Sequence, residues 1–223
     1  MNDYKRFNPS YIEDRPDLRR LIPSNVRTVL DLGCATGNLG SRLREVNADI
    51  ICWGIECNEE MAKIADKKMA KVFISNLDTF DYSVLPQRYF DCVVCGDVLE
   101  HLINPIAVVQ KLKEVMKDNG YLLVSLPNVS HVTVICNLTF FDNWPWRNEG
   151  IFDRTHIRWF TRRSFFECMV AEGFESVKED RNLRLDYKGT SWINRFSKFL
   201  DIWPIRRFIT YQFLQLYKLS HRG

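Results

Sequence analysis

Four acidic residues stand at or just beyond the ends of apolar runs, where a strand would present its last side chains to a ligand. They are Asp31, Glu56, Asp78 and Asp97. A carboxylate in such a place accepts hydrogen bonds from hydroxyl and amine groups. It also attracts positive charge and repels an anionic pyrophosphate. We therefore expect these residues to serve a ligand that carries positive charge and hydrogen-bond donors.

A turn of small residues follows the first of these acids. Residues 28–40 read T-V-L-D-L-G-C-A-T-G-N-L-G, with Gly33, Ala35 and Gly37 between an apolar run and helix-like sequence. Small residues let the backbone come close to a bound molecule, because a Cβ atom would fill the space. The first free N–H groups of the following helix point outward. The spacing differs from the G-x-G-x-x-G of dinucleotide turns, and an ordinary strand-to-helix turn is the alternative.

Three stretches resemble class I S-adenosylmethionine-dependent methyltransferases. D-L-G-C-A-T-G resembles their glycine-rich motif, which usually has Gly where this chain has Ala35. G-D-V-L-E-H-L-I-N-P, residues 96–105, resembles the segment that many small-molecule members carry after the fourth strand. D-x-T-H-I-R-x-F-T is similar to a segment of methyltransferases from bacterial glycan and natural-product pathways. The resemblance implies S-adenosyl-L-methionine as cofactor and S-adenosyl-L-homocysteine as product.

The resemblance also implies a role for each strand-end residue. Glu56 lies 25 residues beyond Asp31, and its carboxylate would accept both ribose hydroxyls. Asp78 would take the exocyclic amine of adenine, with Leu77 against the ring, although turn chemistry explains Asp78 almost as well. Asp97 and its backbone would face the amino-acid end of the cofactor.

Two side-chain clusters raise the question of a metal. Asp97, Glu100 and His101 have the spacing i, i+3, i+4, which would place three ligand types on one helical face. We expect a local hydrogen-bonded cap there and no metal, and a divalent ion is the alternative. Cys92 and Cys95 form a C-x-x-C in a likely strand, F-D-C-V-V-C. An offset of three puts them on opposite faces, so we expect neither a metal nor a redox pair.

These residues need a scaffold that brings strand ends together. Apolar runs and helix-like segments alternate five times up to residue 126, which predicts an α/β fold, Rossmann-like and doubly wound, with helices on both faces of a mostly parallel sheet. Ligands bind beyond the carboxyl ends of such strands. The family resemblance implies seven strands with the last antiparallel. We expect strands over 49–56, 71–75, 89–95, 121–126, 174–179 and 210–219, and helices over 38–46, 58–69, 106–116 and 164–172, with Gly120 as a left-handed cap.

An aromatic insertion, residues 128–160, follows the fifth strand. Its tryptophans and phenylalanines suit stacking on a sugar or aromatic acceptor, or equally the packing of a small subdomain. Arginines in it can meet an acidic or phosphorylated acceptor, although solvated surface is the more frequent place for arginine. They are Arg147, Arg154 and Arg158.

Histidine suits the role of general base for a hydroxyl acceptor, because its unperturbed pKa is about 6.5. His131 and His156 lie in the insertion and are the predicted catalytic residues, with His101 third. A structural hydrogen-bonding role is the alternative for each of them.

Composition places the chain among globular proteins. It has 223 residues, 46% of them hydrophobic and 26% charged, with a net charge of +3, which gives no reason to expect nucleic acid. Seven cysteines at irregular spacing are typical of reduced thiols. The polar N-terminus lacks a signal peptide's apolar core. We expect one domain in the cytoplasm, with a lead-in over residues 1–25.

The C-terminal segment is basic. From residue 187 onward it has seven lysines and arginines and one aspartate. We expect a basic amphipathic helical insertion over residues 187–209, before the last strand. Such a helix would contact the inner membrane face or a lipid-linked acceptor, or it would pack on the sheet with its charges snorkelling.

The sequence thus predicts methyl transfer to a small-molecule or glycan acceptor, with a sugar hydroxyl preferred. A quinone-like acceptor is the alternative within the class. A non-catalytic protein of the same fold, which binds a partner or a membrane, is the alternative outside it. A nicotinamide oxidoreductase is disfavoured by Asp31 and the glycine spacing. Oligomeric state is left open.

Overall fold

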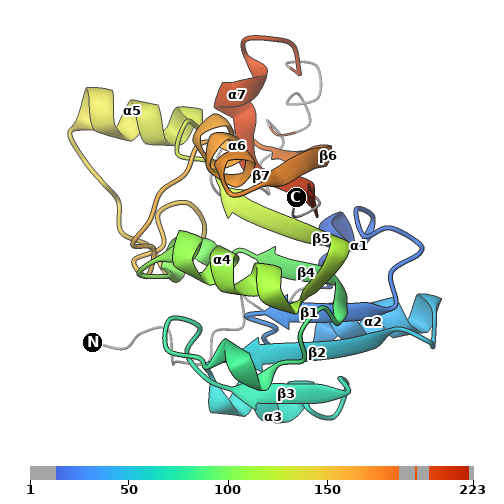
Figure 1. The fold of residues 1–223 in the computed structure, drawn as a ribbon. Helices are drawn as coiled ribbons and strands as arrows, with labels where there is room; N and C mark the ends of the chain where they lie inside the picture. The colour runs from blue at the N-terminus through green and yellow to red at the C-terminus, as the bar shows by residue number, and fades with distance from the viewer. Residues whose placement is uncertain (1–13, 186–193, 195–200, 221–223) are drawn as a thin grey trace.

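Among the described residues, seven strands form one mixed sheet through the centre of the protein (Figure 1). A computed structural model describes residues 14–185, 194 and 201–220. The strand order is β3-β2-β1-β4-β5-β7-β6, and β7 runs antiparallel to both its neighbours while the other pairs are parallel. The Rossmann-like fold class is confirmed. The strands are β1 (Thr28–Leu32), β2 (Ile51–Glu56), β3 (Lys71–Ile74), β4 (Phe90–Gly96), β5 (Met116–Pro127), β6 (Phe174–Leu183) and β7 (Thr210–Leu219).

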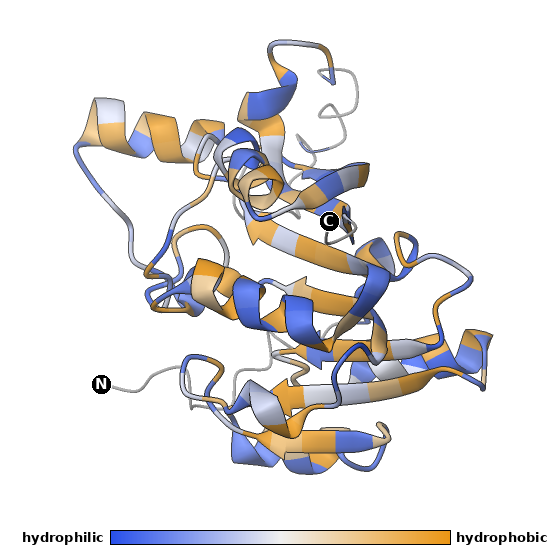
Figure 2. Cartoon of the chain, in the orientation of Figure 1, coloured by the Kyte–Doolittle hydropathy of each residue, from blue (hydrophilic) through white to orange (hydrophobic). Residues whose placement is uncertain are grey.

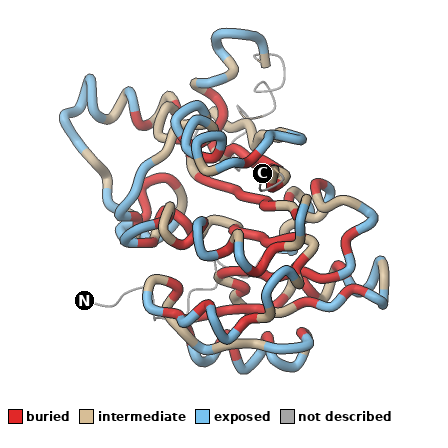
Figure 3. The backbone as a smooth tube through the Cα atoms, in the orientation of Figure 1, coloured by how far each residue is buried: buried red, intermediate tan, exposed pale blue. Residues whose placement is uncertain are grey.

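Helices cover both faces of the sheet and close two apolar cores. One core includes Val108 of α4 (Pro105–Val115) and Phe165 of α6 (Arg162–Ala171). The other includes Leu18 of α1 (Pro16–Arg19), Leu39 of α2 (Asn38–Val46) and Ala65 of α3 (Glu59–Ala65). Figure 3 shows the resulting buried band along the central strands. The sheet is therefore fixed from both sides, and its strand ends are held rigidly.

Strand β4 shows how the side-chain alternation of a strand divides the two cores. Val93 and Cys95 enter the core under α4, whereas Cys92 and Val94 enter the opposite one. The cysteines of the C-x-x-C therefore lie on opposite faces, as predicted. Both are fully buried and free.

The turn between α4 and β5 differs from the prediction. Helix α4 ends at Val115, and β5 begins at Met116, five residues earlier than expected. Asn119, with φ of 62°, takes the left-handed conformation that was predicted for Gly120. Gly120 is needed for space instead, because a Cβ atom there would lie 2.8 Å from the Lys117 carbonyl oxygen.

The aromatic insertion contains a helix that the sequence did not reveal. Helix α5 (Val132–Phe141) projects from the body of the protein (Figure 1) and is largely apolar (Figure 2). Val134 is its buried residue, while Phe140 and Phe141 are 75% and 71% exposed. Within the described parts of the chain, nothing covers the apolar end of α5, and an exposed apolar helix face of this kind is typical of a surface that binds another molecule.

The C-terminal segment is described in part. The predicted helical insertion over residues 187–209 lies mostly outside the described residues. A short helix, α7 (Arg206–Ile209), precedes β7, and β7 matches the predicted last strand. No helix in the described parts of the chain is long and apolar enough to cross a membrane.

Candidate active site

A large crevice opens at the carboxyl ends of β1 to β5, where the strand order reverses around β1 and β4. Its volume of about 2120 Å³ exceeds the roughly 300–1,000 Å³ of a site for one small ligand, so a cofactor and an acceptor fit side by side. Six of the eight residues predicted to bind the cofactor line it: Gly33, Ala35, Glu56, Leu77, Asp78 and Asp97.

The turn after β1 is left-handed at three positions. Gly33, Ala35 and Gly37 have φ of 67°, 46° and 72°, so Ala35 adopts a conformation that usually favours glycine. A Cβ atom on Gly33 would lie 2.9 Å from Val98, and one on Gly37 would lie 3.1 Å from Ala65. Gly37 does not line the crevice. It lets α2 start close to α3, a packing role where the sequence predicted cofactor contact.

Glu56 is built into the floor of the crevice at the end of β2. Its Oε2 accepts the Ala35 N–H at 2.9 Å, and its Oε1 accepts the Asn58 N–H at 2.8 Å. The residue is 7% exposed. The Cys57 thiol also lies 3.5 Å from Oε1. Each carboxylate oxygen has two acceptor sites, so Oε2 keeps one for a ligand hydroxyl. The two N–H groups hold the carboxylate in place, and its contact with the ribose stays a prediction.

Asp78 and Leu77, which follow β3, also line the crevice. Asp78 Oδ1 accepts the N–H groups of Ile103 and Asn104, at 3.0 and 3.4 Å, which ties the loop after β3 to the start of α4. Oδ2 takes no hydrogen bond from the described residues and is available to an amine. Leu77 is 6% exposed and presents an apolar edge to the crevice.

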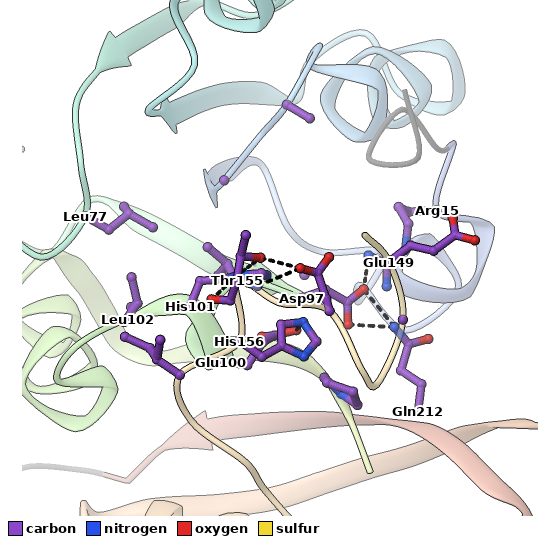
Figure 4. Close-up of a pocket in the computed structure, with 18 of the residues that line it drawn as sticks. Arg15, Leu77, Asp97, Glu100, His101, Leu102, Glu149, Thr155, His156 and Gln212 are labelled. Atoms are coloured by element: carbon purple, nitrogen blue, oxygen red, sulfur yellow. Dashed lines mark hydrogen bonds and ion pairs between the residues drawn. The ribbon is translucent and has the colours of Figure 1, made fainter. Parts of the chain in front are cut away.

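Asp97 lies between two side chains from distant parts of the chain (Figure 4). Arg15 Nη1 is 2.7 Å from its Oδ2, and Gln212 Nε2 is 2.6 Å from its Oδ1. Arg15 also donates to the Ser125 hydroxyl. The sequence analysis missed both partners, since nothing local marks contacts 82 and 115 residues apart.

The predicted helical face of Asp97, Glu100 and His101 is wrong. Asp97 has a left-handed φ of 55°, and only a three-residue 3-10 helix, Leu99–His101, follows. The peptide turns between Asp97 and Glu100, so Asp97 points to Arg15 and Gln212 while Glu100 and His101 point elsewhere.

Asp31 lies beneath the turn and does not line the crevice. It is 6% exposed. Burial raises its pKa to about 7, against the opposing effect of the Arg15 charge, and the Glu56 charge raises it further. Near pH 7 a carboxyl group with this pKa is only partly ionised, and a positive charge bound nearby favours its ionised form. Asp31 therefore makes the crevice more receptive to a cation.

His131 is fully buried and is the N-cap of α5. Its Nε2 is 2.8 Å from the Arg184 carbonyl oxygen, and its Nδ1 is 2.8 Å from the Thr133 hydroxyl. It does not line the crevice. The structure thus gives His131 a local capping role, and its predicted role as base has no support from the geometry.

His156 lines the crevice beside Glu100 and His101. Burial lowers its pKa to about 4, with the neighbouring His101 as the second cause. Burial likewise lowers the pKa of His101 and raises that of Glu100 well above its usual value. The histidines are therefore neutral at pH 7. The structure thus brings together the predicted base His156, the third candidate base His101, and Glu100, which was expected to belong to a local cap.

Some residues of the insertion pack a small apolar core, and others line the crevice. Trp144 packs on Phe152 with ring centroids 5.0 Å apart, in a small core with Val134. Trp146 is 58% exposed and lines the crevice. The predicted packing role is therefore observed, whereas stacking of an aromatic residue on the acceptor stays a prediction, for which Trp146 is the candidate. Arg147 and Arg154 line the crevice, whereas Arg158 donates to the Ile103 carbonyl.

The fold and the carboxylates that line the crevice at the strand ends define a Rossmann-like domain suited to a cationic nucleoside cofactor. A family profile described as a methyltransferase domain matches residues 4–179. The chain therefore belongs to the class I S-adenosylmethionine-dependent methyltransferases, with S-adenosylmethionine as the cofactor.

Similar proteins extend this finding. A ubiquinone biosynthesis O-methyltransferase of Proteus mirabilis is 28% identical over 131 residues, 55% of this chain and 50% of the relative. The chain spans about half the length of the curated relatives it matches. A SAM-dependent methyltransferase from Archaeoglobus fulgidus has a TM-score of 0.64 at 23% identity, with 91% of each chain covered. The plantazolicin methyltransferase BpumL in complex with SAH has a TM-score of 0.58 at 14% identity, with 88% and 77% covered. These two structures show the fold.

Proposed function

We propose that the protein transfers a methyl group from S-adenosylmethionine to a hydroxyl oxygen of a small molecule, preferably a sugar. The observation that supports this most is the arrangement of the crevice. Its cofactor end has Glu56 and Asp78, and its other end has a neutral histidine, an exposed tryptophan and two arginines. Relatives named ubiquinone biosynthesis O-methyltransferases favour oxygen as the accepting atom.

The cofactor supplies a methyl group on a positively charged sulfur that leaves as a neutral thioether. What the chain must provide is alignment, and a group that takes the hydroxyl proton. Glu56 and Asp78 would hold the nucleoside, and Asp97 with Arg15 would define the amino-acid end. His156 Nδ1 lies 3.3 Å from the Ile151 carbonyl oxygen, which only accepts. The hydrogen is therefore on Nδ1, and Nε2 carries the lone pair that can receive a proton.

The arginines favour an acceptor with a phosphate. Arg147 and Arg154 line the crevice near Trp146. A nucleotide-linked or lipid-linked sugar offers a ring face for the tryptophan and phosphates for the guanidinium groups. A quinone-like acceptor would use the tryptophan and leave the arginines without a role.

The test is product formation with two acceptor classes. Purified protein is incubated with S-adenosylmethionine and either nucleotide-linked sugars or a hydroxylated quinone headgroup, and S-adenosylhomocysteine release is measured. We expect turnover with the sugars, and Arg154→Gln should raise KM for a phosphorylated sugar more than it lowers kcat. Turnover with the quinone headgroup alone would replace the sugar proposal. Cofactor binding without turnover on any acceptor would favour the non-catalytic alternative.

We also propose that α5 rests on a membrane surface in the cytoplasm, where a lipid-linked acceptor would be reached. The helix exposes Ile135, Leu138, Phe140 and Phe141, and Trp203 before α7 is 86% exposed. Aromatic and aliphatic side chains of this kind enter the boundary of headgroups and acyl chains. All seven cysteines are free, which is typical of a reducing compartment.

Vesicle binding tests this contact. Phe140→Ser with Phe141→Ser should weaken sedimentation with anionic vesicles, while Val46→Ser, which changes another exposed residue (78%) on α2, should not. Equal binding of all three proteins would remove the membrane proposal and leave α5 as a surface for another partner.

A further inference from the structure

Glu100 has a buried carboxyl group that no hydrogen bond from the described residues stabilises. The residue is 1% exposed, and neither Oε1 nor Oε2 has a hydrogen-bond partner among the described residues. A buried carboxylate ordinarily accepts several hydrogen bonds or faces a positive charge. No described residue supplies such a partner, so Glu100 is either protonated or faces a cation.

Two histidines lie beside this carboxylate, and each has a lone pair on Nε2. His101 Nδ1 is 3.2 Å from the Thr155 carbonyl oxygen, and His156 Nδ1 is 3.3 Å from that of Ile151. Because a carbonyl only accepts, both Nδ1 atoms carry hydrogen, and both Nε2 atoms have a lone pair. Histidines that bind metals are oriented in this way, by a hydrogen bond from the opposite ring nitrogen to a carbonyl or carboxylate.

The three side chains lie close together among the residues that line the crevice (Figure 4). His156 Nε2 is 3.8 Å from Glu100 Oε1, and one ligand atom from each of the three residues lies within 4.8 Å of the others. Two ligand atoms about 2.1 Å from one ion are at most about 4.2 Å apart. The cluster needs only a small contraction to hold an ion.

We propose that Glu100, His101 and His156 form a binding site for a divalent transition-metal ion. Two imidazoles and one carboxylate suit Zn²⁺, Mn²⁺, Fe²⁺ or Co²⁺, whereas Mg²⁺ and Ca²⁺ prefer oxygen ligands alone. A proton shared between Glu100 and His156 does not replace the ion in this geometry, because 3.8 Å is too long for a hydrogen bond.

The site joins two segments that are far apart in the sequence. Glu100 and His101 follow β4, whereas His156 comes from the insertion, and Thr155 links the two by contacts to His101. Asp97 is not a ligand, since Arg15 and Gln212 hold it. Three protein ligands leave a position open toward the crevice, as in catalytic metal sites. That an acceptor hydroxyl takes this position rests on the proposed function; the metal site itself does not. With an ion bound, the Nε2 lone pair of His156 is used by the metal, so His156 would take the hydroxyl proton only in the metal-free protein.

The test is binding of Co²⁺ alone to the purified full chain, by calorimetry and visible absorption. We expect one equivalent to bind, with weak d–d bands and without the intense near-ultraviolet band of a cysteine thiolate. Glu100→Gln and His156→Gln should each weaken binding at least tenfold, because even loss of an outer-shell partner costs about 10- to 100-fold. The control, Glu59→Gln, removes an exposed acid on α3 and should bind like wild type.

S-adenosylhomocysteine titration of the same variants separates this proposal from the proposed function. A variant that binds S-adenosylhomocysteine is folded and has an intact cofactor site, whether or not it binds the metal. If the variants do not fold, imidazole ¹⁵N spectra of the wild type test whether the histidines bind the metal. Zn²⁺ should then shift the Nε2 signals of two of the four histidines. No stoichiometric Co²⁺ binding, equal binding by Glu100→Gln, or unshifted signals would overturn the site.

Discussion

The two ends of the crevice are built in different ways. The cofactor end consists of residues at the tips of β1, β2 and β4, or just after β3, so each side chain is placed by its own strand. The acceptor end consists of residues from the insertion that reach the crevice through contacts with distant segments, such as Thr155 with His101. Strand tips fix a site through local sequence, whereas the acceptor end depends on tertiary packing. This arrangement lets one part of a protein change its acceptor while the cofactor site stays constant.

The two predicted histidines give the largest expected contrast. His156→Ala should lower kcat about 100-fold, since it removes either a base or a metal ligand at the crevice, with little change in cofactor affinity. His131→Ala should instead lower the free energy of unfolding by about 1–3 kcal/mol, because it leaves buried partners of the α5 cap unsatisfied. Steady-state kinetics and urea unfolding of both variants check this. A larger fall in kcat for His131→Ala than for His156→Ala would indicate that His131 is the base.

The glycine turn gives a contrast in stability. Gly37 and Gly173 both have positive φ, 72° and 84°, but a Cβ atom would meet Ala65 only at Gly37, since nothing lies within 4 Å at Gly173. Alanine at either position adds backbone strain, and at Gly37 it adds overpacking of about 1–3 kcal/mol. The Gly37→Ala protein should therefore unfold at lower urea concentration than Gly173→Ala. Equal midpoints would show that α2 and α3 separate without cost.

Titration of Asp31 should give the smallest of these effects, a dependence of cofactor affinity on pH. A carboxyl whose pKa rises on folding, here to about 7, stabilises the protein below pH 4, and this contribution is lost as the pH rises through 7. A cationic cofactor favours the ionised form. Affinity for S-adenosylmethionine should therefore increase from pH 6 to pH 8, by at most about tenfold per pH unit. The neutral sulfur of S-adenosylhomocysteine should give a smaller slope.

The Asp31→Asn variant is the matched control, because it keeps the size of the side chain and removes its titration. Calorimetry at pH 6, 7 and 8 should give a flat affinity for this variant. The same slope in both proteins would assign the pH dependence to another group.

The sequence was sufficient for one end of the crevice and insufficient for the other. The place of Glu56 and Asp78 on the crevice could be predicted because a parallel sheet brings all its carboxyl ends to one edge, so position along the chain implies position in space; their contacts with the cofactor stay predictions. Asp97 was predicted at the crevice, but its left-handed backbone, and hence its separation from Glu100, has no marker in the residue type. Arg15, Gln212 and the pairing of His156 with Glu100 depend on how separate segments pack. Helix α5 was missed because its apolar residues lack the periodicity of an amphipathic helix.

The central claim is that the chain binds S-adenosylmethionine through strand-tip carboxylates. Calorimetric titration of wild type and Glu56→Ala with S-adenosylhomocysteine tests it most directly, with Glu59→Ala as the control. Two charge-assisted hydrogen bonds to the ribose should be lost, at about 1.5–3 kcal/mol each, so we expect affinity to fall at least about 100-fold in Glu56→Ala and to stay unchanged in Glu59→Ala. Equal affinity of Glu56→Ala and wild type would contradict the account, because the cofactor would then be held elsewhere.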